Sequence, residues 1–215
     1  MERGIIITLP TSDEVTEYLS AFSKEIIDAC PKNQVLLKKI EKKDVTKSYV
    51  ENMIKKMNYK MIIFNGHGAP DCICGYKDEK IISLGENENL LKNRITYSRS
   101  CWSIMQLGQE CMKKNEGCFI GYLFPFEFII NKNWAANPLK DNIAKVFFDT
   151  SNLVALGLIK GNTAKESNNN SKRSMLKVMN KILNEESPEY KAILETLWVN
   201  YNSQKLIGNG NERLV

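Results

Sequence analysis

Short apolar runs alternate with longer stretches of helical spacing along the first part of the chain. The run GIIITL at residues 4–9 is rich in β-branched residues and is followed by a proline, which is typical of a buried parallel strand. Apolar residues then recur at helical spacing from a cap at Ser12 or Asp13 to a point near Pro31. A second strand at 34–40, a second helix at 44–57 and a third strand at 60–65 follow. This order predicts an α/β fold with a mostly parallel, doubly wound central sheet.

The alternation breaks after the third strand and then resumes. Residues 71–84 form two short extended runs around the turn signal Lys77-Asp78-Glu79, so we expect a hairpin that projects from the carboxyl edge of the sheet. Beyond it, the pattern predicts a short helix at 87–92, a strand at 94–99, a helix at 103–115 and a strand at 117–123.

The last third of the chain is different in character. Residues 124–138 are irregular and aromatic, and they are long enough to be a functional loop. Helical spacing then predicts helices at 139–157, 163–184 and 188–206, with the Asn-rich stretch 167–171 as a candidate break in the middle helix. We expect one domain over residues 1–215, with a sheet core at 1–123 and the aromatic loop and C-terminal helices at 124–215.

Composition narrows the class of protein. The 215 residues contain 43% hydrophobic and 26% charged residues, as expected for a soluble globular chain. The net charge of +5 is spread along the chain, which argues against a nucleic-acid partner. No apolar run approaches about 18 residues, so we expect no membrane partner. Six cysteines without a signal peptide or a framework spacing predict reduced thiols in a cytoplasmic protein.

Two predicted strands each end in a reactive residue. His67 is the only histidine and follows the strand at 60–65, and Cys101 follows the strand at 94–99. The carboxyl ends of parallel strands share one edge of a sheet, so these side chains can meet there. A thiol beside an imidazole is a nucleophile with its base, and we expect the start of the helix at 103–115 to favour the thiolate.

Glycines flank the histidine and supply candidate donors for an oxyanion. Gly66 and Gly68 let the backbone approach a substrate closely, and the Gly68 amide is free to face a developing negative charge. The Cys101 amide is the second candidate donor. An isolated histidine or cysteine is more often structural, but the joint pattern favours a catalytic pair.

Other residues have weaker claims to the site. Asp71, just after the His67 loop, could orient the imidazole or line the cleft, or lie on the loop surface. Trp134 belongs to an aromatic segment that could form a wall for an extended peptide or pack on the C-terminal helices. Cys72 and Cys74 share one face of a strand but lack further ligands, so we expect neither a metal nor an organic cofactor. Cys111 and Cys118 are candidate core residues, and the helix at 188–206 is read as a core element with a docking face as the alternative.

The two motifs, Asn65-Gly66-His67-Gly68 and Ser100-Cys101-Trp102-Ser103, resemble those of clan CD cysteine peptidases, the caspase-like proteins. The sequence is most similar to the CHAT and prokaryotic caspase-homologue branch, over about residues 4–123. The resemblance implies a caspase-like α/β/α sandwich, with His67 as general base and acid, Cys101 as nucleophile, and Gly68 and Cys101 as oxyanion donors. The chain departs from true caspases, because Ser-Arg-Ser-Cys-Trp replaces Gln-Ala-Cys-Arg-Gly.

In this clan the residue two before the nucleophile tends to line the pocket for the side chain that precedes the cut. Here that residue is Arg99. A guanidinium group there would repel a basic side chain and bind a carboxylate, so we hypothesise cleavage after Asp or Glu. The alternative is that Arg99 turns away to a surface carboxylate.

The expected function is that of a cytoplasmic cysteine endopeptidase that acts on a protein substrate through a Cys101 and His67 dyad. The resemblance implies a regulated protease of a bacterial signalling or defence system, such as a CRISPR-linked one, with a regulatory protein or activator chain as partner. Two alternatives stay open. One is a thiol amidohydrolase on a similar sheet, in which the cysteine usually precedes the histidine; the other is a non-catalytic caspase-like interaction module.

Overall fold

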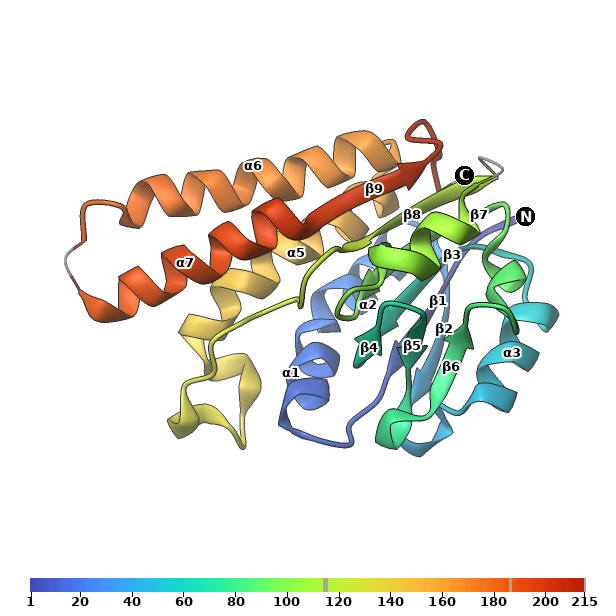
Figure 1. Ribbon diagram of the computed structural model, residues 1–215, viewed down its shortest axis with the longest axis horizontal. Helices are drawn as coiled ribbons and strands as arrows, with labels where there is room; N and C mark the ends of the chain where they lie inside the picture. Colours follow the sequence, from blue (N-terminus) through green and yellow to red (C-terminus); the bar gives the residue numbers. More distant parts are fainter. Residues whose placement is uncertain (114–115, 186, 215) are drawn as a thin grey trace.

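The computed structural model describes residues 1–215 except 114, 115, 186 and 215. Its centre is a sheet made of β1 (Glu2–Leu9), β2 (Leu36–Glu41), β3 (Tyr59–Asn65), β7 (Arg94–Arg99), β8 (Gly117–Tyr122) and β9 (Gln204–Gly208). The strand order is β2-β1-β3-β7-β8-β9, and every neighbouring pair is parallel except β8 with β9 (Figure 1). The predicted α/β fold with a mostly parallel sheet and a helical C-terminal part is therefore confirmed.

Apolar residues on both faces of the central strands explain the layers. One face packs against α1 (Glu14–Phe22), α2 (Lys24–Lys32) and α5 (Asn142–Ile159). The other face packs against α3 (Lys47–Lys56) and a small second sheet. Burial on both sides is why these strands read as continuous apolar runs rather than as an alternating pattern.

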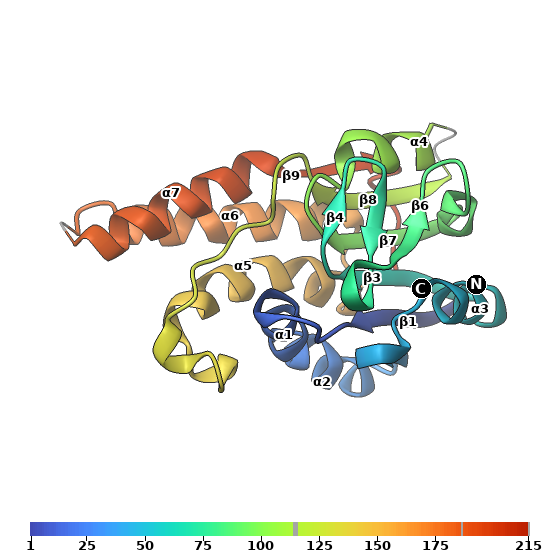
Figure 2. The ribbon, with the colours of Figure 1, turned by 60° about the horizontal axis from the view of Figure 1, so that its bottom comes forward.

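The second sheet contains the predicted hairpin and one further strand. β5 (Cys72–Cys74) and β6 (Lys80–Ser83) are antiparallel, and the very short β4 (Gly68–Ala69) pairs with β5. Ile73 and Ile82 pack against Ile62 and Phe64 of β3, so the hairpin lies on the sheet face instead of projecting from its edge (Figure 2). The hairpin is confirmed, and its expected projection is wrong because its apolar side chains are buried.

The helix expected between residues 12 and 31 is two helices that meet at Ser23. The N–H of Ser23 donates to the carbonyl of Ser20, not to that of Leu19 four residues back. Leu19 O is thereby available to a side chain of the sheet, and it accepts a hydrogen bond from Arg99 Nη2 at 3.2 Å. The break in the helix is thus linked to a buried arginine.

The segment after Cys101 is not the regular helix predicted at 103–115. It forms a π-helical turn, η4 (Ile104–Gly108), followed by the short α4 (Gln109–Cys111), and residues 114 and 115 lie outside the described residues. Gly108 N donates to Ser103 O at 2.9 Å, the five-residue spacing of a π-helix. The N–H groups of Gln106 and Leu107 donate to Pro70 O, which ties this turn to the loop after β4.

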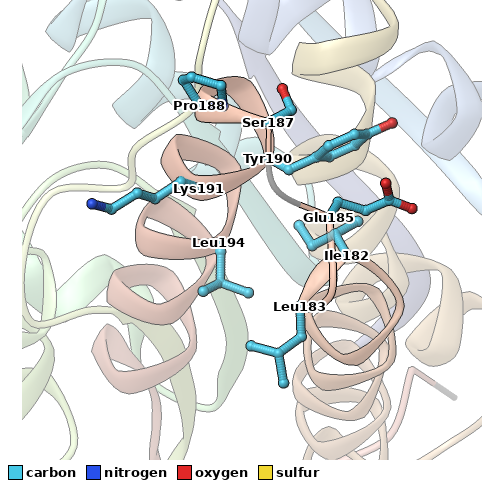
Figure 3. A pocket seen from close by; sticks show the side chains of 8 residues that line it. All are labelled: Ile182, Leu183, Glu185, Ser187, Pro188, Tyr190, Lys191 and Leu194. Atoms are coloured by element: carbon cyan, nitrogen blue, oxygen red, sulfur yellow. The ribbon is translucent and has the colours of Figure 1, made fainter.

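The C-terminal helices α6 (Ala164–Ile182) and α7 (Pro188–Ser203) extend side by side beyond the sheet (Figure 1). Their turn forms a shallow hollow lined by residues such as Leu183, Tyr190 and Leu194 (Figure 3). α6 is continuous through the Asn-rich stretch, so the suggested break is wrong. The helix predicted to reach residue 206 ends at Ser203, where β9 begins.

Gln204 explains both of these corrections. Its side chain is fully buried and accepts a hydrogen bond from the hydroxyl of Tyr122, while its amide donates to Asn168 Oδ1 at 2.9 Å. The polar residues of the Asn-rich stretch therefore face a buried partner on β9. This pairing compensates for their low helix propensity.

α5 is the one described helix that is long and apolar enough to cross a membrane, at a mean hydropathy of 1.2. In the structure 61% of it is buried among other elements. It is a core helix of a compact fold, which is compatible with a soluble protein.

The substitution Gln204→Ala tests the role of this buried amide. We expect the free energy of unfolding to fall by about 2 kcal/mol, because the hydroxyl of Tyr122 and the amide of Asn168 lose their partner. Urea denaturation measures the change. The neighbouring exposed Lys205→Ala is the control and should stay within about 0.5 kcal/mol of wild type; equal losses in the two variants would contradict the prediction.

Candidate active site

Strand ends at the carboxyl edge of the sheet bring the candidate residues together. β3 and β7 are parallel neighbours, as the sequence predicts, and Asn65 is in register with Arg99. His67 and Cys101, each two residues further on, therefore leave the sheet at the same level. The strand order reverses beside β1, and such a switch point is where open α/β sheets bind their ligands.

The glycines around His67 are required by close backbone contacts. Gly66 has φ +148°, and a Cβ there would lie 2.3 Å from Cys74 O. A Cβ on Gly68 would lie 2.8 Å from Ser100 Cβ and 2.9 Å from Cys101 O. The loop that carries the imidazole therefore rests against the backbone of the nucleophile.

Asp13 is the hydrogen-bond partner of His67, a role that the sequence analysis missed. Its Oδ2 lies 3.0 Å from His67 Nε2, and both side chains are partly exposed, at 39% and 37%. Partial burial works against ionisation of Asp13, but the hydrogen bonds from Thr16 N–H and His67 outweigh it and lower the pKa of the carboxyl below 3.8. An ionised carboxylate can only accept, so Nε2 carries the proton and Nδ1 is the basic atom.

The missed role of Asp13 has a clear origin. Asp13 was recognised as a possible helix cap, and it does cap α1 by accepting a hydrogen bond from Thr16 N at 2.9 Å. Its second carboxylate oxygen reaches His67 across 54 positions of sequence. Its place at the end of β1, beside the strand that leads to His67, was the available signal.

Asp71 does not orient the imidazole. Its carboxylate lies 3.5 Å from Lys80 Nζ, across the hairpin, and is largely exposed. The alternative that it lies on the loop surface fits its position, and Asp13 takes the place that was suggested for it.

Cys101 lies next to the His67 loop without a hydrogen bond to the ring. Among the described residues, Asp13 is the side chain that bonds the imidazole. Burial raises the pKa of the Cys101 thiol above 9.0, the Phe126 backbone amide partly offsets this rise, and the Glu127 carboxylate adds to it. The expected help from a helix N-terminus is wrong here, because the following turn is short and π-helical.

Two backbone amides can face an oxyanion at this site. Gly68 is in register with Ile73 of β5, and Cys74 N donates to His67 O. In an antiparallel ladder, this pattern means that Gly68 and Ile73 do not exchange backbone hydrogen bonds with each other. The Gly68 N–H therefore points away from β5. Among the described residues, the Cys101 N–H donates to no other residue. The roles of both amides as oxyanion donors stay predictions.

Arg99 is not a pocket residue, and the prediction that it binds an acidic substrate side chain is corrected. Its side chain is 1% exposed, and its guanidinium donates hydrogen bonds to uncharged groups. Its Nε donates to Asn65 Oδ1 at 2.8 Å, its Nη1 to Asn152 Oδ1 at 2.9 Å, and its Nη2 to Ser23 Oγ at 2.6 Å. Burial lowers the pKa of this group. None of these partners is a surface carboxylate, so the alternative for Arg99 is wrong as well. Its hydrogen bonds instead join buried parts of the core.

Trp134 lies in the loop that follows the aromatic segment. It is 38% exposed in the short helix η5 (Lys132–Trp134), with Lys140 Nζ 5.7 Å from the centre of its ring. The nearby Lys132 Nζ lies 2.7 Å from Glu14 Oε2, which ties this loop to the start of α1. The role of Trp134 as a wall for a substrate peptide stays a prediction.

The aromatic segment before Trp134 does border the nucleophile. Figure 1 shows residues 125–131 as an extended trace between β8 and α5. One edge of this segment is hydrogen-bonded to Asn200 of α7, whose side chain accepts from Glu127 N at 3.0 Å and donates to Glu127 O at 2.6 Å. Backbone groups alternate in direction along an extended chain, so those of Phe126 and Phe128 point to the opposite side. Among the described residues, the backbone of Phe128 has no hydrogen-bond partner.

The remaining cysteines are buried. All six are free thiols, and burial raises the pKa of Cys111 and of Cys118 to about 12, as suits core residues. Cys72 and Cys74 are 1% and 8% exposed. Within the described part of the chain, no group of three or more His, Cys, Asp or Glu side chains is arranged to bind a metal.

No model of a known protein family matches this sequence, and no curated protein sequence does so.

The first prediction for the site concerns the buried arginine. We expect Arg99→Ala to lower the free energy of unfolding by about 3 kcal/mol, because Asn65, Ser23 and Asn152 lose a buried partner. The exposed Arg173→Ala is the control in urea denaturation. A loss within about 0.5 kcal/mol for Arg99→Ala would mean that the side chain faces an open pocket.

The second prediction separates the two roles of Asp13. Asn is a good helix cap, so Asp13→Asn keeps α1 and removes the charge beside His67. We expect the rate at which iodoacetamide alkylates Cys101 to fall about tenfold, whereas Asp71→Asn leaves it unchanged.

The pH dependence of this difference follows from the lowered pKa of Asp13. The folded carboxyl stays ionised below its ordinary pKa of 3.8, so its contribution is fully present above that value and is lost as pH falls through the lower, folded pKa. The two alkylation rates should therefore differ throughout about pH 5 to 8. Equal rates in this range would exclude Asp13 from the site.

Proposed function

We propose that this protein is a cysteine endopeptidase of the caspase-like type, with Cys101 as nucleophile, His67 as base and acid, and Asp13 as the residue that orients the imidazole. The observation that supports it most is that His67 and Cys101 follow neighbouring, in-register strand ends beside one switch point, with Asp13 bonded to His67 and the Gly68 backbone beside that of Cys101. The resemblance of the two motifs to clan CD peptidases points to the same activity.

The chemistry follows from the hydrogen bonds of the site. Asp13 accepts from Nε2–H of His67, so Nδ1 takes the proton of the Cys101 thiol. The thiolate attacks the peptide carbonyl, and the negative charge on oxygen is stabilised by the N–H groups of Gly68 and Cys101. The imidazolium then protonates the leaving amine, and water hydrolyses the thioester to free the acid and restore the thiol. No metal or organic cofactor is needed for these steps.

The extended segment 125–131 supports a polypeptide substrate over a small amide. Its edge away from Asn200 presents the backbone groups of Phe128, which have no hydrogen-bond partner among the described residues. Open backbone donors and acceptors on an extended segment are a template for another extended chain. A small amide would make no use of such an edge, so this feature argues against a thiol amidohydrolase.

The separation of the thiol from the imidazole supports regulation of the protease. Cys101 is partly buried, and its sulfur is not bonded to His67. We propose that a regulatory protein or activator chain increases the share of molecules in which the imidazole reaches the thiol, a state that the isolated chain also adopts. The resemblance suggests a bacterial signalling or defence system, such as a CRISPR-linked one, as the setting, and the six free thiols fit a reducing cytoplasm.

The same observation favours the second candidate function, a non-catalytic caspase-like interaction module. A module without catalysis does not require an imidazole bonded to the thiol. The contact between Asp13 and His67 argues for the enzyme, since a partly exposed pair of this kind adds little stability.

The test is labelling of Cys101 by a peptidyl acyloxymethyl ketone, measured by mass spectrometry of peptides from the intact chain. We expect labelling at pH 7 that disappears in Cys101→Ala and falls about 100-fold in His67→Ala, because the general base is lost. Cys111→Ala, which removes a buried thiol, is the control. Labelling that is independent of His67, or spread over Cys72, Cys74 and Cys111, would favour the interaction module.

A further inference from the structure

Three large apolar side chains beside the nucleophile face solvent. Trp102 is 36% exposed, Met105 44% and Phe124 54%. Trp102 follows Cys101 directly, its N–H is directed at Phe124 O at 3.4 Å, and Met105 N donates to Trp102 O at 2.9 Å. Backbone hydrogen bonds thus hold the three residues next to one another, and we call them the apolar platform.

The backbone of Trp102 is in an unfavourable conformation. Its φ is +54°, in the left-handed region that glycine adopts without cost and that a bulky side chain rarely adopts. Strain of this kind is unfavourable and tends to occur at functional sites. A glycine would fit this turn better, so the packing of the turn does not account for the indole.

Internal packing does not account for the platform either. Among the described residues, neither the ring of Trp102 nor that of Phe124 stacks on another aromatic ring. Phe126, two residues further along the chain, is different. It is 7% exposed, and the centre of its ring lies 4.9 Å from that of Tyr122. The exposed faces of Trp102 and Phe124 are therefore free to receive another apolar group.

The charges nearby disfavour an acidic group at the same place. Glu127 is exposed and close enough to act on the Cys101 sulfur. The one arginine that could have attracted a carboxylate, Arg99, is buried and fully engaged. The surroundings of the nucleophile are thus apolar with a negative charge at one side.

We infer that the apolar platform selects the substrate, by binding a large aromatic or branched aliphatic side chain that flanks the scissile bond. This inference rests on the proposed function, because it assigns a specificity to the same nucleophile. Contact with an aromatic face discriminates a large apolar residue from a small or charged one by a factor of roughly ten or more. Trp102 is then a specificity-determining residue, and its strained backbone places the indole at the mouth of the site.

The experiment is a cleavage profile on a peptide library, read by mass spectrometry, which reports both residues that flank each cut. We expect the wild-type chain to cleave next to Phe, Tyr, Trp, Leu or Ile. In Trp102→Gly this enrichment should fall about tenfold, while the melting temperature stays equal or rises because the strain at this position is relieved. Trp198→Ala, which removes an exposed tryptophan on α7, is the matched control and should leave the profile unchanged.

The outcomes separate this inference from the proposed function. Cleavage that depends on His67 but shows no apolar enrichment, or an enrichment that survives in Trp102→Gly, overturns the inference and leaves the peptidase. Absence of any cleavage also overturns it. In that case, labelling of Cys101 by the ketone probe tests the proposed function itself. Labelling that depends on His67 supports the peptidase, and labelling that does not depend on His67 contradicts both the peptidase and the inferred specificity.

Discussion

The buried guanidinium of Arg99 is the constraint on which the site depends. A charged group that is 1% exposed is tolerated only if its N–H groups find acceptors, and these come from β3, from α5 and from the junction of α1 and α2. Asn65 in turn donates to Thr8 O at 2.7 Å, which extends the network to β1. The strands that lead to Asp13, His67 and Cys101 are thus joined by one set of hydrogen bonds a few residues before these side chains.

The sequence was sufficient for the parts of the fold that follow from local pattern. Apolar runs located β1, β3, β7 and β8, and a thiol and an imidazole at neighbouring strand ends indicated the site. The sequence was insufficient where a contact with a residue far along the chain determines the local structure. The break at Ser23 depends on Arg99, and the end of α7 depends on the antiparallel pairing of β9 with β8. Asp13 looked like a helix cap, because one of its oxygens is one, and only the fold brings the other to His67.

Arg99 also shows why a residue's position in a motif does not fix its role. Two residues before a nucleophile, a side chain can point into a pocket or into the core, and the alternation of a strand allows either. Here Ser23 and Asn152 offer acceptors on the core side, so the guanidinium points inward. If the protein is the proposed peptidase, substrate selection would fall to residues that remain exposed beside Cys101, and Trp102 directly follows the nucleophile.

Regulation of the proposed peptidase would act on groups whose backbones are already neighbours. A Cβ on Gly68 would lie 2.9 Å from Cys101 O, so the loop that carries the imidazole is next to the backbone that carries the thiol. Asp13 bonds the imidazole, while the thiol is partly buried beside the Phe126 amide. A movement of the segment 125–131 would uncover the sulfur and open a strand edge at the same time. Under the proposed function, access of the substrate and activation of the nucleophile would therefore be coupled through the same few residues, and a partner that binds this segment would control both.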